Sequence, residues 1–116
     1  MRTLPAAWLR AASVRKWAMT RDQATFELAR RADALRARGA EAAFLFGSTA
    51  RGEARDDSDL DVFIDVMPGR KFSLIDLAGM HAFLVEELGI QIDLTTRNSL
   101  HPKLRDQIES EAVRIF

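Results

Sequence analysis

The fold of this chain is decided by the stretch Phe44-Leu-Phe-Gly-Ser-Thr-Ala-Arg-Gly-Glu-Ala-Arg-Asp-Asp-Ser-Asp-Leu-Asp-Val-Phe-Ile-Asp65. It begins in a short apolar run, residues 42–46, that breaks at Gly47-Ser48. A polar, glycine-containing segment then leads into a second apolar run, residues 60–66. Short apolar runs bounded by turn residues are typical of buried strands. The stretch therefore predicts two strands, joined by a turn or short helix and a loop.

Two carboxylates, Asp59 and Asp61, stand at the entrance of the second apolar run. Side chains two residues apart on a strand point to the same face, so we expect the two carboxylates side by side, with Cα atoms about 6.6 Å apart. Neighbouring carboxylates repel each other unless a cation lies between them. A hard divalent ion with oxygen ligands would fit there. The alternating apolar residues of this run should point the other way, into a core: Leu60, Val62, Ile64 and Val66.

The composition sets bounds on the class of protein. A chain of 116 residues, 47% of them apolar, can form one domain with its own core. It has no cysteine, which excludes disulfides and thiolate metal sites. Its apolar runs are too short to span a bilayer, so we expect no membrane role. The lack of cysteine mildly favours a reducing cytoplasm, which is the expected location. A net charge of zero gives no general argument for nucleic-acid binding.

Residues 1–19 are expected to form a basic N-terminal extension or a weak helix ahead of the domain proper, residues 20–116. The first 21 residues carry five arginine or lysine side chains and no acid. They contain no uninterrupted apolar segment and no clear cleavage site, so a secretory signal is not predicted. Met19 is an alternative natural start, and the sequence leaves that choice open.

The remaining pattern predicts helices over residues 21–38, 74–88 and 103–114 and a third strand over residues 90–95. We expect the first helix to begin at a capping box of Thr20 and Gln23, and the second after Ser73. The order predicts a small α/β (α+β) domain, a small mixed sheet with flanking helices. The helix residues expected to face the core are Phe26, Ala29, Ala32, Leu35, Leu74, Leu77, Leu84, Leu88, Leu104, Ile108, Ala112 and Ile115.

Polar side chains on the helices have plainer interpretations. His81 lies on the apolar stripe of the second helix and is expected to be packed or to face a partner, rather than to bind a metal. Asp65 is expected to be a surface acid. The arginines of the first helix are expected to form a solvated face: Arg30, Arg31, Arg36 and Arg38.

Asp93 is a lone acid on the polar face of the third strand, opposite Ile92 and Leu94. An acid in so apolar a strand is disfavoured unless it is paired or binds a ligand. If the strands are neighbours, Asp93 joins Asp59 and Asp61 in an oxygen-ligand cluster suited to magnesium, which leaves positions for phosphate oxygens. The plainer alternatives are a solvated Asp pair and an Asp93 that pairs with an arginine.

Gly47 and Ser48 end the first strand with small residues, so that backbone amides can approach a phosphate. Arg51 is close enough in sequence to add a charged fork for the same phosphates. Taken alone, a Gly-Ser after a strand is usually only a turn. The order and spacing of these residues together with the three acids favour a phosphate site.

These residues resemble a known signature. Gly47-Ser48-Thr-Ala-Arg51-Gly52 followed by Ser58-Asp59-Leu-Asp61-Val is similar to the motif of minimal nucleotidyltransferase (MNT) domains in the DNA polymerase beta-like superfamily. The family pattern is a Gly-Ser, an Asp-x-Asp on the next strand and a third Asp on a later strand. All three parts are present, and the resemblance covers residues 20–116. It implies the polymerase beta-like nucleotidyltransferase fold.

The resemblance also implies roles for individual residues. Gly47 and Ser48 would hold the triphosphate of ATP, and Arg51 would assist them. Asp59 and Asp61 would bind magnesium as ligands. Asp93 would complete the metal site and help to activate the acceptor hydroxyl. With two magnesium ions, that hydroxyl would attack the α-phosphorus of ATP in line, and pyrophosphate would leave.

The small size of the domain bears on the acceptor. Superfamily members that act on primers, tRNA or antibiotics carry further domains, and none is evident here. Stand-alone domains of this kind resemble the antitoxins of type VII-like HEPN/MNT toxin–antitoxin pairs. That resemblance implies AMP transfer to a hydroxyl, a tyrosine, of a HEPN toxin in a heteromeric complex, with no direct nucleic-acid partner. Two alternatives stay open: a nucleotidyltransferase that acts on a small-molecule hydroxyl, and a non-catalytic antitoxin that neutralises its partner by binding.

Overall fold

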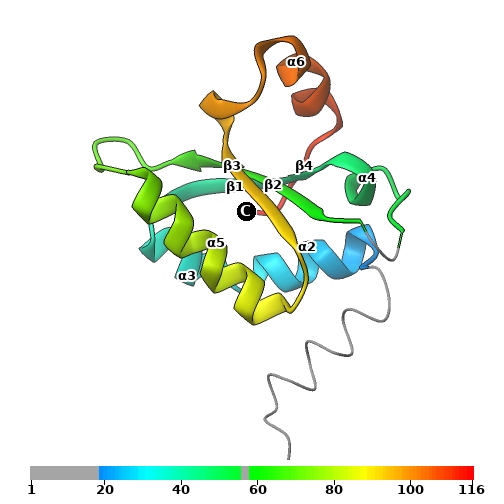
Figure 1. Ribbon diagram of the computed structural model, residues 1–116, viewed down its shortest axis with the longest axis horizontal. Helices are drawn as coiled ribbons and strands as arrows, with labels where there is room; N and C mark the ends of the chain where they lie inside the picture. The colour runs from blue at the N-terminus through cyan, green and yellow to red at the C-terminus, as the bar shows by residue number, and fades with distance from the viewer. Residues whose placement is uncertain (1–18, 56–57) are drawn as a thin grey trace, which may run out of the picture.

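The computed structural model describes residues 19–55 and 58–116, so the expected extension lies outside the described residues except for Met19. The elements, in chain order, are α2 (Arg21–Ala29), α3 (Ala32–Ala37), β1 (Ala40–Phe46), α4 (Gly47–Ala50), β2 (Leu60–Val66), α5 (Leu74–Leu88), β3 (Ile92–Thr96), η1 (Arg97–Ser99), α6 (Pro102–Glu111) and β4 (Val113–Arg114). The strands form one sheet in the order β3-β2-β1-β4, with α2, α3 and α5 on one face and α6 on the other (Figure 1). This is the small mixed sheet with flanking helices that the sequence predicted.

The pairing of the strands determines where their ends meet. β1 and β2 are antiparallel, so the chain reverses direction through α4 and the loop that follows it. β2 and β3 are parallel, and α5 forms the crossover between them. β4 adds a short antiparallel pair to the other edge of β1. As a result, the starts of β2 and β3 lie side by side, next to the end of β1.

The core lies between the sheet and the three helices on one of its faces. As predicted, Leu60, Val62 and Ile64 of β2 are buried there, and Val66 packs against them from a partly buried position. Ile92 and Leu94 of β3 belong to the same core. The intervening residues of β2 and β3 therefore point to the opposite face, where the predicted acids stand.

The prediction of a single helix over residues 21–38 is wrong. The chain forms α2 and α3, with a turn at Arg30 and Arg31 between them, although the capping box of Thr20 and Gln23 is confirmed. Ala24 and Leu28 face the core, whereas Phe26 is 64% exposed. Residues two apart on an α-helix are rotated by about 200° around its axis. A helix that buries Ala24 therefore turns Phe26 outward.

Arg31 was expected in a solvated arginine face and is instead largely buried. Its side chain is 10% exposed and forms ion pairs with Glu27 at 2.8 Å and with Glu87 of α5 at 3.2 Å. It thereby ties α2 to α5 at the point where the first helix breaks. The other three arginines of the set are exposed, as predicted.

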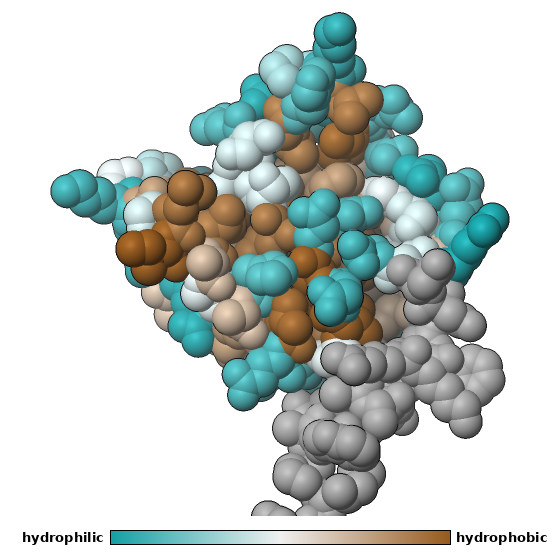
Figure 2. All heavy atoms as spheres, viewed as in Figure 1, coloured by the Kyte–Doolittle hydropathy of each residue, from teal (hydrophilic) through white to brown (hydrophobic). Residues whose placement is uncertain are grey.

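α5 has the predicted bounds. Ser73 and Asp76 form a capping box at its start, and Gly89 ends it in the left-handed conformation. The residues of α5 that face the core differ from the prediction. Met80 is fully buried, whereas Leu74, which was expected to face the core, is 83% exposed. Leu74 and its equally exposed neighbour Ile75 contribute to the apolar surface near the start of α5 (Figure 2).

The last predicted helix is too long. α6 ends at Glu111, and Val113 and Arg114 form β4 against Leu45 and Phe44 of β1. No residue of α6 is buried, and Leu104, which was expected to face inward, is 51% exposed. Among the described residues, no helix has both the length and the apolar character needed to cross a membrane.

Candidate functional site

The predicted turn at the end of β1 is built on a glycine that no other residue can replace without strain. Gly47 has φ +75°, in the left-handed region. A Cβ at this position would lie 2.1 Å from Oδ2 of Asp61. The structure thus brings the predicted phosphate turn and a predicted metal ligand into direct contact.

α4 starts at Gly47 itself, earlier than the short helix or turn predicted over residues 49–54. Ser48 is half-buried, and its carbonyl accepts a hydrogen bond from the Glu53 amide at 2.8 Å. The Gly47 carbonyl accepts a bond from the Arg51 amide at 3.2 Å. These backbone bonds fix the turn beside the start of β2.

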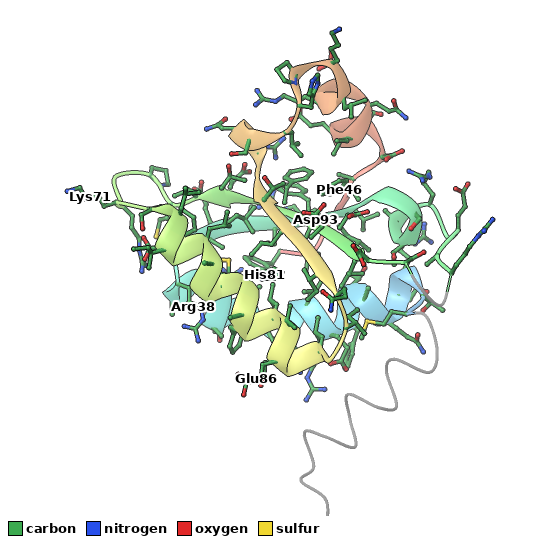
Figure 3. All side chains as sticks on the ribbon, in the orientation of Figure 1. Arg38, Phe46, Lys71, His81, Glu86 and Asp93 are labelled. Carbon is green, nitrogen blue, oxygen red and sulfur yellow. The ribbon has the colours of Figure 1, made fainter. Side chains whose placement is uncertain are left out.

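Asp61 and Asp93 are register partners on the parallel strands β2 and β3, and Phe46 is the partner of Asp61 on β1. All three stand on the face of the sheet opposite the buried residues, the face toward α6 (Figure 3). Asp59 precedes β2 and is exposed. Asp93 was predicted to join Asp59 and Asp61 only if their strands are neighbours. β2 and β3 are neighbours in the sheet.

Among the described residues, no cationic side chain pairs with Asp61 or with the two acids near it. Burial, followed by the negative charges of Asp93 and Asp59, raises the pKa of the Asp61 carboxyl to about 6, while Arg51 opposes this shift. Within residues 19–55 and 58–116, none of the three carboxylates forms an ion pair, so the alternative of an Asp93–arginine pair is not observed. The site carries an excess of negative charge that a cation would relieve.

The donor chemistry fits magnesium, since every candidate ligand is a carboxylate oxygen. As they stand, however, no three Asp, Glu, His or Cys side chains of the described chain are gathered tightly enough to hold a metal ion. The assignment of these three residues as metal ligands therefore stays a prediction.

Arg51, the predicted phosphate ligand, is at present paired with two acids. Its guanidinium contacts Glu53 and Glu111 of α6, each at 3.1 Å, with 41% of the side chain exposed. Its charge nevertheless reaches Asp61, because it lowers that pKa. Arg51 is near enough to take part in the site, and its phosphate role stays a prediction.

An open cleft of about 440 Å³ lies where the start of α2 faces α4. Arg51 and Gly52 of the motif line one side of it, and Thr20 and Arg21 line the other. The sequence offered no signal for the contribution of α2, because these residues are some thirty positions from the motif. Arg21 and Asp22 both line the cleft and lie 3.8 Å apart, so the charge of Arg21 is partly offset there.

Sequence reasoning also missed Arg97. Its guanidinium binds both oxygens of Asp65, at 2.7 and 3.1 Å, and contacts Glu109 of α6. It lies 4.8 Å from the ring centroid of Phe44 and 5.0 Å from that of Phe63. Asp65 is therefore a partly buried partner of Arg97 and not simply a surface acid. This cluster attaches α6 to the sheet face that carries Asp61.

Comparison with known proteins leads to the same class of enzyme as the motif and the arrangement of the acids. The model of the nucleotidyltransferase domain family matches residues 28–115, about three quarters of the chain. The chain belongs to this family. The enzyme class that the sequence predicted, nucleotidyltransferase, is thereby confirmed.

Relatives and solved structures agree with the assignment. The chain is 41% identical over 78 residues to MJ0435 of Methanocaldococcus jannaschii, provisionally named a protein adenylyltransferase, covering 67% of this chain and 82% of that one. It is 33% identical over 73 residues to protein adenylyltransferase MntA of Thermococcus cleftensis, covering 61% and 70%. A solved structure of a provisionally assigned minimal nucleotidyltransferase matches with a TM-score of 0.65 and 37% identity, covering 83% of this chain and 96% of that one. The resemblance to minimal nucleotidyltransferases drawn from the motif is thus confirmed, and one similar protein carries the name MntA.

Proposed function

We propose that this nucleotidyltransferase transfers AMP from ATP to a hydroxyl of a partner toxin, a tyrosine of a HEPN protein, and so acts as its antitoxin. The observation that carries the proposal is the contact of Gly47 with Asp61, whose register partner is Asp93. This contact places the turn predicted to bind phosphate beside two neighbouring carboxylates, at the ends of adjacent strands. The relatives named protein adenylyltransferase support transfer to a protein.

One solved structure of the same fold motivates the choice of a toxin as partner and of ATP as nucleotide. A chain of a toxin–antitoxin crystallised with AMP-PNP matches this chain with a TM-score of 0.64 and 19% identity, covering 79% of this chain and 72% of that one. At that identity only the fold is shared. The toxin partner and ATP are therefore part of the proposal for this chain.

The chemical step is a displacement at phosphorus. A bond forms between the acceptor oxygen and the α-phosphorus, the bond from that phosphorus to the bridging oxygen breaks, and pyrophosphate leaves with the electron pair. Asp93 would accept the proton of the acceptor hydroxyl as that oxygen attacks phosphorus, and would later release the proton to solvent. Gly47 and Ser48 would hold the triphosphate, with Arg51 beside them. Two magnesium ions, held by Asp59, Asp61 and Asp93, would neutralise the charge on the phosphates.

Most of the catalysis would come from positioning and charge, because phosphoryl transfer needs little covalent chemistry from the protein. The rigid turn at Gly47 and the parallel register of β2 and β3 provide that positioning. The cleft between α2 and α4 offers room for a nucleotide beside Arg51. A protein that neutralised its partner by contact alone would have no use for three unpaired carboxylates.

The experiment incubates the full-length chain with ATP, magnesium and the toxin encoded beside its gene. Mass spectrometry should find the toxin heavier by one or more AMP units. Asp59→Asn with Asp61→Asn should abolish the gain, whereas Asp106→Asn, an exposed acid on α6, should leave it unchanged. A wild-type chain that binds ATP but adds no AMP would overturn the proposal. Transfer by the double variant would overturn the metal-site assignment.

A further inference from the structure

His81 contacts the strand that carries Asp93 although it lies on another element. Its Nε2 is 2.7 Å from the carbonyl oxygen of Ile92, and the side chain is partly buried between α5 and β3 (Figure 3). A carbonyl can only accept a hydrogen bond, so Nε2 must carry the proton and donate. The imidazole is thus more than an apolar filler, because its ring N–H bonds the backbone of β3.

The Ile92 carbonyl is one that the sheet itself leaves unpaired. In the register of β2 and β3, the Leu60 amide donates to the Gln91 carbonyl at 3.0 Å. Successive carbonyls of a strand point to opposite sides, so the Ile92 carbonyl points away from β2. In the described part of the chain, β3 is an edge strand with no further strand on that side of it. Within the described chain, His81 supplies the donor that a neighbouring strand would otherwise provide.

The bond fixes a peptide unit of the candidate site. The Ile92 carbonyl and the Asp93 amide belong to one planar group. His81 holds the oxygen end of this group, and the parallel ladder directs the Asp93 amide toward β2. The peptide is therefore held from both sides immediately before the Asp93 side chain.

Asp93 depends on this support more than its neighbours do. Its carboxylate is exposed and makes no ion pair or side-chain hydrogen bond within residues 19–55 and 58–116. Asp61, by contrast, is wedged against the Gly47 turn and lies on a strand that is paired on both sides. Only the backbone of an edge strand sets the position of Asp93 relative to Asp61.

We propose that His81 is a positioning residue for Asp93, acting through the Ile92 carbonyl. The inference rests on the proposed function in one respect, the metal role of Asp93. His81 would keep the peptide before Asp93 in one orientation, so that its carboxylate converges with Asp61 on the same cation. Loss of partners that orient metal ligands typically costs 10–100-fold in metal affinity.

The test compares two substitutions by Mn²⁺ affinity, with Mn²⁺ as the probe for the magnesium site, in the full chain without ATP or toxin. His81→Leu keeps the apolar packing and removes the donor, whereas His81→Gln keeps a donor. We expect His81→Leu to weaken Mn²⁺ binding about tenfold, and His81→Gln to restore most of that loss. Glu86→Gln, an exposed change on the same helix, should bind as the wild type does.

A double-substitution cycle separates positioning from general stability. In an Asp93→Asn background, His81→Leu should cause no further loss of Mn²⁺ affinity, because the carboxylate it positions is gone. Additive losses, or a His81→Leu chain that is less stable but binds Mn²⁺ like the wild type, would overturn the inference. A wild-type chain that bound no Mn²⁺ would overturn it as well. Mn²⁺ binding as expected without AMP transfer would overturn only the proposed function.

Discussion

Gly47 and Asp61 lie in direct contact: the space where Gly47 would carry a Cβ is filled by Oδ2 of Asp61, 2.1 Å away. Gly47 begins α4 directly after β1, whereas Asp61 belongs to β2, and their contact links the two halves of the candidate site. The carboxylate can occupy its place only because residue 47 has no side chain. The left-handed φ of Gly47 imposes the same residue for a second reason.

Gly47→Ala should therefore disable the site and not merely strain the turn. The added methyl group must displace the Asp61 carboxylate, and we expect Mn²⁺ affinity to fall at least tenfold. Gly52→Ala is the matched control, because Gly52 also has φ +75° but has nothing within 4 Å of a Cβ. Both variants should lose about 1–2 kcal/mol of stability from the left-handed backbone. Equal Mn²⁺ binding by the two variants would contradict the steric account.

The local parts of the site could be predicted from the sequence. Gly47 and Ser48 sit at a strand end, and strand alternation places Asp61 on the polar face; both are properties of a few adjacent residues. The proximity of Asp93 was a conditional prediction, because alternation gives the face of a strand and not its neighbour. The parallel pairing of β2 with β3 supplied that condition.

The parts that the sequence could not supply depend on distant contacts. Arg97 and Asp65 are 32 positions apart, and neither has a local pattern that indicates the other. β4 has only two residues, too few for an alternation to appear, and it forms because the edge of β1 is available. At the break between α2 and α3, Arg31 pairs with Glu87, which belongs to a helix more than fifty residues later.

The raised pKa of Asp61 predicts how the stability of the metal-free chain depends on pH. Because the pKa in the folded chain, about 6, is above that of an unfolded aspartate, the folded state binds the proton more tightly. Stability should therefore decrease as pH rises from about 4 to 6. The loss should be roughly 1–2 kcal/mol, after allowance for solvent screening.

Urea unfolding in the presence of a chelator, at pH 4 and pH 7.5, would measure this loss. Asp61→Asn should flatten the dependence, while Asp106→Asn should keep it. Without metal at pH 7.5, Asp61→Asn should be the more stable of the two chains, because it lacks the buried charge. Saturating magnesium should make the wild type the more stable one, since the cation binds only the folded chain. The same pH slope in wild type and Asp61→Asn would show that Asp61 is not the titrating group.

The cluster around Arg97 should contribute to stability beyond an ordinary surface ion pair. Arg97→Lys keeps the charge but loses the two-point contact with Asp65 and the stacking on Phe44 and Phe63. We expect a loss of about 2 kcal/mol in the free energy of unfolding. Arg30→Lys, at an exposed pair with Glu27, should cost less than about 1 kcal/mol. Equal losses in denaturant unfolding would mean that the cluster adds nothing beyond its charge.

Arg51 gives the sharpest test of nucleotide binding, because its structural and phosphate roles can be separated. Arg51→Ala removes both the ion pair with Glu111 and the predicted phosphate contact, whereas Glu111→Gln removes the ion pair alone. An exposed ion pair contributes little to stability, so both variants should remain folded. Calorimetry with a non-hydrolysable ATP analogue and magnesium should show about tenfold weaker binding for Arg51→Ala, the effect of one lost charged contact. Glu111→Gln should bind at least as tightly as the wild type, since it frees the guanidinium for the phosphates. If Glu111→Gln weakened binding as much as Arg51→Ala, Arg51 would act by holding α6 in place and not by contacting the nucleotide.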